Sequence, residues 1–212
     1  MDQKTILRII DILQKEYDIS GYSNRGDAFE ILIGTVLSQR TKDEVTWVRN
    51  KELMKKANTS QKILKLTEKE IAEIIYPVGF YKQKASRIKE ISRILVEKYG
   101  DKVPNNREEL MGLPGVGGKT ADCVMCFSYG EQVIPVDVHV EVMSKRLGIA
   151  DWKDKPEIVR KKLHEIIPKN KRNLINSLFV EHGKRICTTR RAYCEKCAIE
   201  KYCPKYTKPI PL

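Results

Sequence analysis

Apolar residues recur along this chain with the spacing of amphipathic helices, and almost nowhere with the two-residue alternation of strands. The sequence therefore predicts an all-α fold. The first apolar stripe precedes a Ser20–Gly21 turn and consists of Ile6, Ile9, Ile10 and Leu13. Further helices are expected over residues 28–38, from about 68 to 75, from before 88 to a stop at 100, and over 138–147, 156–166 and 173–185.

Capping residues mark where several of these helices begin. Asp27 is an expected N-cap for a nearly all-apolar helix, and Thr67 with Glu70 has the capping-box pattern. Pro156 suits the first turn of a helix. Asn105 or Asn106 is expected to cap a short helix that ends at residue 112.

A glycine-rich turn follows that short helix and leads into another helix that begins near Lys119. Glycines 115, 117 and 118 allow backbone N–H groups to approach a ligand closely, and the helix N-terminus adds partial positive charge. This pattern indicates phosphate binding, with a plain Pro-Gly turn as the alternative. The Walker spacing is absent, so nucleoside triphosphate binding is not supported.

Composition and charge indicate the partner. The 212 residues are 41% hydrophobic and 32% charged, which is typical of a globular chain. Forty Lys and Arg face 28 Asp and Glu, a net charge of +12, and half of this excess falls within residues 184–208. The charge favours nucleic acid as a partner over a membrane surface, and a merely solvated basic surface is the alternative.

No segment approaches the roughly 18 apolar residues that a membrane span requires, and the first residues lack the pattern of a signal peptide. We therefore expect an intracellular protein, in the cytoplasm or at the nucleoid, with no membrane partner. Nothing in the sequence indicates an obligate oligomer, so we expect a monomer.

Four of the six cysteines lie within seventeen residues, at intervals of six, two and five: Cys187, Cys194, Cys197 and Cys203. Disulfides are not expected inside a cell, so the spacing indicates a metal site. Zinc and a 4Fe–4S cluster both remain open, because zinc ligands usually form two close pairs and cluster ligands tolerate irregular spacing. Arg190 and Arg191 lie within this loop. They indicate that the metal has a structural role and stabilises a loop that contacts phosphate.

The other two cysteines, Cys123 and Cys126, also form a Cys-x-x-Cys pair. They lie in a predicted buried helix, where cysteine behaves as a small hydrophobe. A redox pair is the alternative, but no βαβ pattern surrounds them.

Lys119 and Asp137 are the candidates for catalysis. Lys119 is expected in a first helical turn, where the helix dipole and partial burial favour the neutral amine that can form a Schiff base. A phosphate contact is the alternative. Asp137 precedes another predicted helix and suits an N-cap, a carboxylate that stabilises positive charge on a sugar, or both.

Three ordered motifs together resemble the endonuclease III family of the helix-hairpin-helix DNA glycosylase superfamily: Leu113–Ala121, Val136–His139 and the four clustered cysteines. The similarity extends from Phe29 to Cys203. It implies two helical domains that flank a DNA-binding cleft. One is residues 22–132, with the hairpin motif at about 106–128, and the other is residues 1–21 plus 133–212, which carries a 4Fe–4S cluster.

The resemblance also implies a function, that of a base-excision-repair bifunctional DNA glycosylase and DNA-(apurinic or apyrimidinic site) lyase. Its substrates are oxidised or ring-saturated pyrimidines in duplex DNA. By this resemblance Lys119 attacks C1′ of a flipped nucleotide, Asp137 assists, and the resulting Schiff base permits β-elimination. The four cysteines ligate the cluster, and the DNA contacts include Leu113, Gly115, Gly117, Gly118, Arg190 and Arg191.

Two further segments resemble the family's base-contacting loops, with departures. Phe80 stands where a wedge leucine is common, and packing in the core is its alternative. Arg40 stands where bacterial relatives have a glutamine that fills the void, so Gln39 or Arg40 faces the orphaned base. Arginine only donates hydrogen bonds and suits guanine edges. Val142 stands where relatives often carry arginine.

Two other functions stay open. A glycosylase for mispaired thymine or uracil, from the same superfamily, is motivated by Arg40. A DNA-binding module that uses the hairpin and the cysteine loop only as backbone clamps is the non-enzymatic alternative. Lys119 favours the bifunctional enzyme, because relatives that remove a base without cutting the strand typically lack a lysine there.

Overall fold

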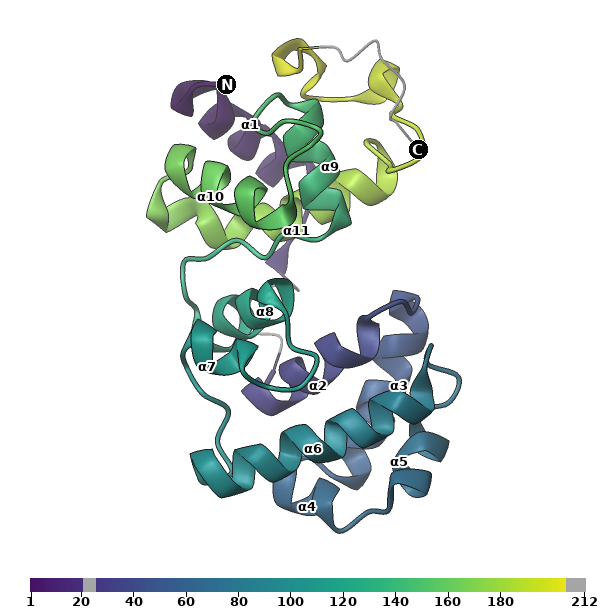
Figure 1. The fold of residues 1–212 in the computed structure, drawn as a ribbon. Helices are drawn as coiled ribbons and strands as arrows, with labels where there is room; N and C mark the ends of the chain where they lie inside the picture. Colours follow the sequence, from purple (N-terminus) through teal and green to yellow (C-terminus); the bar gives the residue numbers. More distant parts are fainter. Residues whose placement is uncertain (21–25, 205–212) are drawn as a thin grey trace. The chain divides into compact units, whose positions relative to one another are not determined.

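The computed structural model describes residues 1–20 and 26–204 of the chain, and no strand occurs among them. The chain divides into two compact units, residues 24–129 and residues 1–23 with 130–212 (Figure 1). Both are built from helices, which confirms the predicted all-α fold class. No helix in the described ranges is long and apolar enough to cross a membrane.

The unit of residues 24–129 contains α2 (Ala28–Ser38), α3 (Asp43–Lys56), α4 (Ser60–Leu64), α5 (Glu68–Ile75), α6 (Tyr81–Tyr99), α7 (Arg107–Met111) and α8 (Gly118–Tyr129). Helix α2 is buried on most sides, as its nearly all-apolar sequence predicts, and it packs against α3, α6 and α8. It therefore connects the hairpin helices with the rest of this unit.

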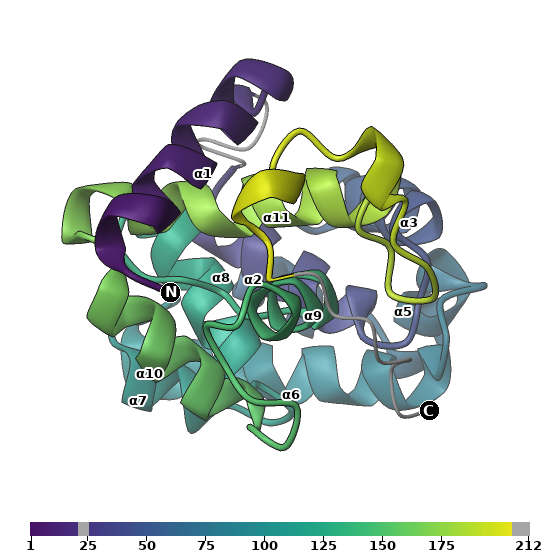
Figure 2. The same cartoon turned by 90° about the horizontal axis from the view of Figure 1, so that it is seen from above.

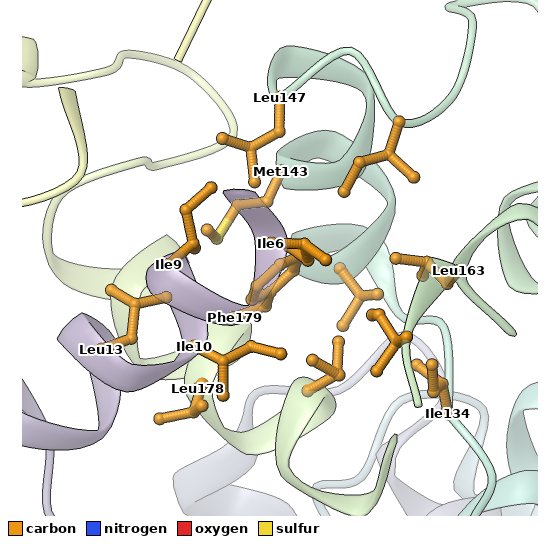
Figure 3. Packing of buried hydrophobic residues seen from close by; sticks show 14 of the residues in the cluster. Ile6, Ile9, Ile10, Leu13, Ile134, Met143, Leu147, Leu163, Leu178 and Phe179 are labelled. Atoms are coloured by element: carbon orange, nitrogen blue, oxygen red, sulfur yellow. The ribbon is translucent and has the colours of Figure 1, made fainter. Parts of the chain in front are cut away.

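The other unit contains α1 (Gln3–Glu16), α9 (Val138–Arg146), α10 (Pro156–Ile166), α11 (Arg172–Arg185) and three short 3-10 turns, Lys169–Lys171, Cys194–Lys196 and Glu200–Tyr202. Helices α1 and α11, far apart in sequence, lie side by side (Figures 1 and 2). Figure 3 shows apolar side chains of four helices that meet in one core, among them Ile6, Met143, Leu163 and Phe179.

The capping signals read from the sequence are confirmed. Asp27 accepts a hydrogen bond from the Phe29 backbone N–H at the start of α2. Thr67 and Glu70 form both hydrogen bonds of a capping box at α5. Asn106, rather than Asn105, caps α7.

Two helices, α3 and α4, were not anticipated from the periodicity. Helix α3 buries only Thr46 and Leu53 and leaves Trp47 exposed, so it has no continuous apolar stripe. Helix α1 ends at Glu16, before the expected turn, and Gly21 lies outside the described residues. The expected domain boundary between residues 21 and 22 also lies outside them.

Candidate active site

The glycine-rich hairpin between α7 and α8 is anchored by buried side chains and presents its backbone. Leu113 and Val116 are buried, and the Val116 N–H donates to the Leu113 carbonyl over 3.1 Å. Gly115 has φ +71°, and Gly117 is exposed with open space around its α-carbon. Because the Leu113 side chain is only 3% exposed, this residue can reach a ligand only through its backbone.

Lys119 is the second residue of α8, as the sequence predicted. The expectation of partial burial is wrong, because the Lys119 side chain is exposed. The five residues that follow it in α8, residues 120–124, are all buried, whereas Lys119 at the start of the helix is not covered. Its amine is therefore accessible to a large substrate.

Two side chains from elsewhere in this unit contact the hairpin at Gly115: Gln39, just after α2, and Arg87 on α6. Gln39 Nε2 donates to the Gly115 carbonyl oxygen over 2.9 Å. A Cβ atom at Gly115 would lie 2.4 Å from Cδ of Arg87, so a larger residue would force the arginine side chain to move, and the positive φ of Gly115 also favours glycine. Sequence reasoning missed Arg87, although its spacing of three residues from Lys84 on α6 places both on one helix face.

Beside this contact lies a cavity of about 190 Å³ lined by Gln39, Arg40, Phe80, Gln83, Lys84 and Arg87. Three of these side chains are cationic and none is a carboxylate, so the cavity suits a ligand rich in hydrogen-bond acceptors. Phe80 is 53% exposed, which contradicts the alternative that it packs in the core.

Arg40 and Phe80 adopt an uncommon backbone conformation. Both have positive φ, +52° and +57°, although neither is glycine. The Arg40 guanidinium carbon lies 5.6 Å from the centroid of the Phe80 ring, within the range of a cation–π interaction. The turns that carry them approach closely at Gly79, where a Cβ atom would lie 2.6 Å from the Arg40 carbonyl oxygen.

Lys84 holds these two turns together. Its side chain is buried, and its ammonium group donates to the carbonyl oxygens of Leu37 and Gln39 and to Thr41 Oγ1. Thr41 Oγ1 also accepts a hydrogen bond from the Gly79 N–H over 3.1 Å. Burial lowers the pKa of Lys84 to about 8.

We expect Lys84→Met to destabilise this unit by about 2–4 kcal/mol, because buried acceptors lose their donor. Chemical denaturation measures the loss. Lys82→Met, at an exposed position on the same helix, is the control and changes stability by less than about 0.5 kcal/mol. Equal stabilities of the two variants would contradict the role of Lys84.

Asp137 is the N-cap of α9, where its carboxylate accepts a hydrogen bond from the Val140 N–H over 2.9 Å. The segment before it is fixed by the buried Asn176, whose Nδ2 donates to the Pro135 carbonyl over 2.8 Å. The predicted N-cap is confirmed, and Asp137 remains partly exposed, so a second role of its carboxylate is not blocked.

The cysteine loop follows α11 and supplies four thiols. Arg146 Nη1 lies 3.1 Å from Cys187 Sγ, and His182 Nε2 lies 3.4 Å from Cys197 Sγ. Burial raises the pKa of the Cys187 thiol, and burial together with the other loop thiols raises the pKa of Cys197 to about 11. Cys194 is exposed, and the Cys203 thiol lies 3.6 Å from the Arg146 carbonyl oxygen.

Within residues 1–20 and 26–204, no three His, Cys, Asp or Glu side chains are grouped so that they could hold a single metal ion. A 4Fe–4S cube requires less convergence, because each thiolate binds a separate iron. The donor set of four thiols, two of them beside hydrogen-bond donors, fits such a cluster.

The remaining predicted residues lie as follows. Arg190 and Arg191 are exposed in the cysteine loop, and the Arg191 guanidinium lies 5.0 Å from the Tyr193 ring centroid. Cys123 and Cys126 are buried in α8, which confirms their prediction as core residues.

Comparison with known proteins gives the family. A family model described as "HhH-GPD superfamily base excision DNA repair protein" matches residues 33–169. The chain belongs to this superfamily. This protein is 42% identical to endonuclease III of Thermotoga maritima, and the matched region covers 86% of this chain and 85% of that protein. The predicted resemblance is confirmed.

Solved structures of the same fold agree. The protein chain in the structure of a trapped endonuclease III–DNA covalent intermediate is 33% identical in sequence to this chain. The two structures superpose with a TM-score of 0.89 over 96% of each chain. A thermostable thymine-DNA glycosylase is 27% identical, with a TM-score of 0.83, covering 95% of this chain and 96% of that one.

Proposed function

We propose that this HhH-GPD protein is a base excision repair DNA glycosylase with AP lyase activity. Its proposed substrates are oxidised or ring-saturated pyrimidines in duplex DNA. The observation that carries the proposal is the exposed Lys119 amine in the first turn of α8, directly after a hairpin that presents its backbone. The 42% identity to a protein named endonuclease III supports the same activity.

The DNA backbone is the proposed ligand of the hairpin and of the cysteine loop. Backbone N–H groups at the start of α8 lack intrahelical partners and attract phosphate oxygens. Leu113, Gly115, Gly117 and Gly118 contribute backbone contacts, and Arg190 and Arg191 contribute charged ones. Because the ligand is chromosomal DNA, we also propose that the protein acts at the nucleoid, as a monomer.

The proposed reaction begins when Lys119 Nζ attacks C1′ of the damaged nucleotide. The N-glycosidic bond breaks, and the base leaves with the bonding electron pair and takes up a proton. The bound amine then gives up one proton, the C1′–O4′ bond breaks as O4′ takes up a proton, and a protonated Schiff base to the opened sugar remains. Loss of a proton from C2′ then breaks the bond to the 3′ phosphate oxygen, which cuts the strand.

Asp137 is the proposed carboxylate that assists this step. A negative charge stabilises the positive charge that develops on the sugar as the base leaves. The same carboxylate can accept a proton from the attacking amine. Gln39 or Arg40 is the proposed contact to the base opposite the lesion, and Phe80 is the proposed wedge that stacks into the gap left by the flipped nucleotide.

Borohydride trapping tests the proposal. The purified protein is incubated with a thymine-glycol duplex and borohydride, and a covalent protein–DNA adduct is sought on a denaturing gel. An adduct supports the bifunctional glycosylase. No adduct, together with trapping of an AP-site duplex, contradicts the substrate class and directs the search to mispaired bases.

A 4Fe–4S cluster is the proposed cofactor, bound by Cys187, Cys194, Cys197 and Cys203. When bound, it supplies a cross-link that holds the loop in one conformation. Burial raises the pKa of the unligated Cys197 thiol to about 11, and ligation to iron would replace the thiol proton. The loop then presents Arg190 and Arg191 in a fixed arrangement.

We expect Cys197→Ser to lose iron and to weaken DNA binding, with no change in the rate of the chemical step for bound substrate. Iron analysis, DNA titration and single-turnover kinetics measure these effects. Cys123→Ala is the matched control, because Cys123 is buried in α8 outside the loop. Full iron content in Cys197→Ser would contradict the ligand assignment.

A glycosylase for mispaired thymine or uracil is the second candidate. It is favoured by Arg40, which lines the cavity that suits a ligand rich in hydrogen-bond acceptors. Arginine pairs with guanine O6 and N7, and such a contact discriminates by about 1–3 kcal/mol. We expect excision opposite guanine to exceed excision opposite adenine by about tenfold or more, and Arg40→Gln to reduce that ratio. Comparing excision from mismatched and oxidised duplexes separates the two candidates. If Arg40→Gln leaves the guanine-to-adenine ratio unchanged, Arg40 does not recognise the opposite base.

A further inference from the structure

His182, near the end of α11, contacts the cysteine loop through both its backbone and its side chain. Its carbonyl oxygen accepts hydrogen bonds from the N–H groups of Ile186 and Cys187, over 2.8 and 2.9 Å. Its imidazole is only 1% exposed, and its Nε2 lies 3.4 Å from Cys197 Sγ. One buried residue therefore contacts two of the four cysteines.

The other imidazole nitrogen of His182 contacts Tyr17, the C-cap residue of α1. Tyr17 Oη lies 2.9 Å from His182 Nδ1, and the two rings pack edge to face with centroids 5.8 Å apart. Tyr17 is itself 6% exposed. Burial raises its pKa to about 12, so its hydroxyl keeps a proton to donate.

The direction of these hydrogen bonds follows from the chemistry of a ligating thiolate. A thiolate bound to iron carries no proton, so Cys197 Sγ can only accept a hydrogen bond. The proton of a neutral imidazole must then be on Nε2, which leaves Nδ1 as an acceptor. The Tyr17 hydroxyl, 2.9 Å from Nδ1, is the donor that this tautomer requires.

We infer that His182 donates an Nε2–H hydrogen bond to the Cys197 thiolate, that Tyr17 fixes the required tautomer, and that this pair raises the reduction potential of the cluster. The inference rests on the cluster proposed above. His182 and Tyr17 are positioning residues, because neither touches DNA or a reacting atom in this assignment.

The physical reason lies in the charge on the sulfur. A hydrogen bond to a ligating sulfur stabilises the more electron-rich oxidation state of a cluster, and its removal favours the oxidised state. The donor is the His182 imidazole, which is buried and contacts Tyr17 through one nitrogen and Cys197 through the other. Solvent water therefore does not replace it in the intact protein. Tyr17 at the end of α1 thereby influences the reduction potential of a cluster bound by Cys197, which lies 180 positions later in the sequence.

The test is a redox titration of the purified holoprotein, followed by electron paramagnetic resonance, with iron and sulfide measured for every sample. We expect His182→Leu to shift the reduction potential to more negative values. His182→Gln, which keeps an N–H donor near the position of Nε2, remains close to wild type. Tyr17→Phe gives a smaller negative shift, because the tautomer is no longer enforced.

Tyr129→Phe is the matched control, since it removes a tyrosine hydroxyl bonded to the Val103 carbonyl in the other unit and shifts no potential. A fully loaded His182→Leu protein with the wild-type potential overturns the inference, as does an equal shift in His182→Gln. If His182→Leu assembles no cluster, Tyr17→Phe is the deciding variant, and a fully loaded Tyr17→Phe protein with the wild-type potential overturns the inference. Wild-type protein without iron and sulfide overturns the cluster itself, and this inference with it.

Discussion

Lys119→Gln is expected to abolish borohydride trapping and to reduce strand cleavage by on the order of 10³-fold or more. The substitution removes the only amine in the first turn of α8 and leaves the hairpin backbone in place. Because Lys119 is exposed, its loss leaves no cavity and should change stability little. Trapping gels and single-turnover cleavage of a thymine-glycol duplex measure the effect.

Lys119→Arg separates the nucleophile from a mere phosphate contact. Arginine keeps the positive charge, but its guanidinium stays protonated and cannot attack carbon. We therefore expect this variant to bind DNA with nearly wild-type affinity and to form no adduct. Strand cleavage by Lys119→Arg would show that the lysine serves only as a charge, and Lys102→Gln, at an exposed position before α7, controls for the loss of one surface charge.

Asp137→Asn is expected to lower the rate of base removal by about 10²–10⁴-fold, through loss of a carboxylate that assists proton transfer and stabilises charge. Asparagine is as good an N-cap as aspartate, so the hydrogen bond to the Val140 N–H can persist. The comparison therefore isolates the charge from the structural role.

Asp137→Ala removes both functions of this side chain. We expect the same loss of rate as in Asp137→Asn, with an additional loss of about 1 kcal/mol of stability from the missing cap. Single-turnover kinetics and chemical denaturation of the two variants measure these effects separately. Wild-type activity in Asp137→Asn would reduce Asp137 to a helix cap.

Much of the fold was predictable because helix formation depends on residues close in sequence. The start of α2 at Asp27, the capping box at Thr67 and the stop of α6 at Gly100 each follow from interactions within one helical turn. Helix α3 escaped prediction because its buried residues, Thr46 and Leu53, form no continuous stripe and its position depends on packing against α2 and α5.

The candidate site divides in the same way. The hairpin, the position of Lys119 in a first turn and the intervals of the four cysteines are properties of short segments, and the sequence alone predicted them. The exposure of Lys119 was predicted wrongly, since it depends on how far other segments cover the first turn of α8, and only the residues after Lys119 are covered.

The helical class, the family and the candidate residues for chemistry could all be read from the sequence, because caps, turns and cysteine intervals are encoded within a few consecutive positions. Only the tertiary structure showed that Lys84 clamps the turns of Arg40 and Phe80, and that Tyr17 reaches His182 across 165 positions. Such contacts form when distant segments fold together, and no local pattern specifies which buried donor meets which acceptor.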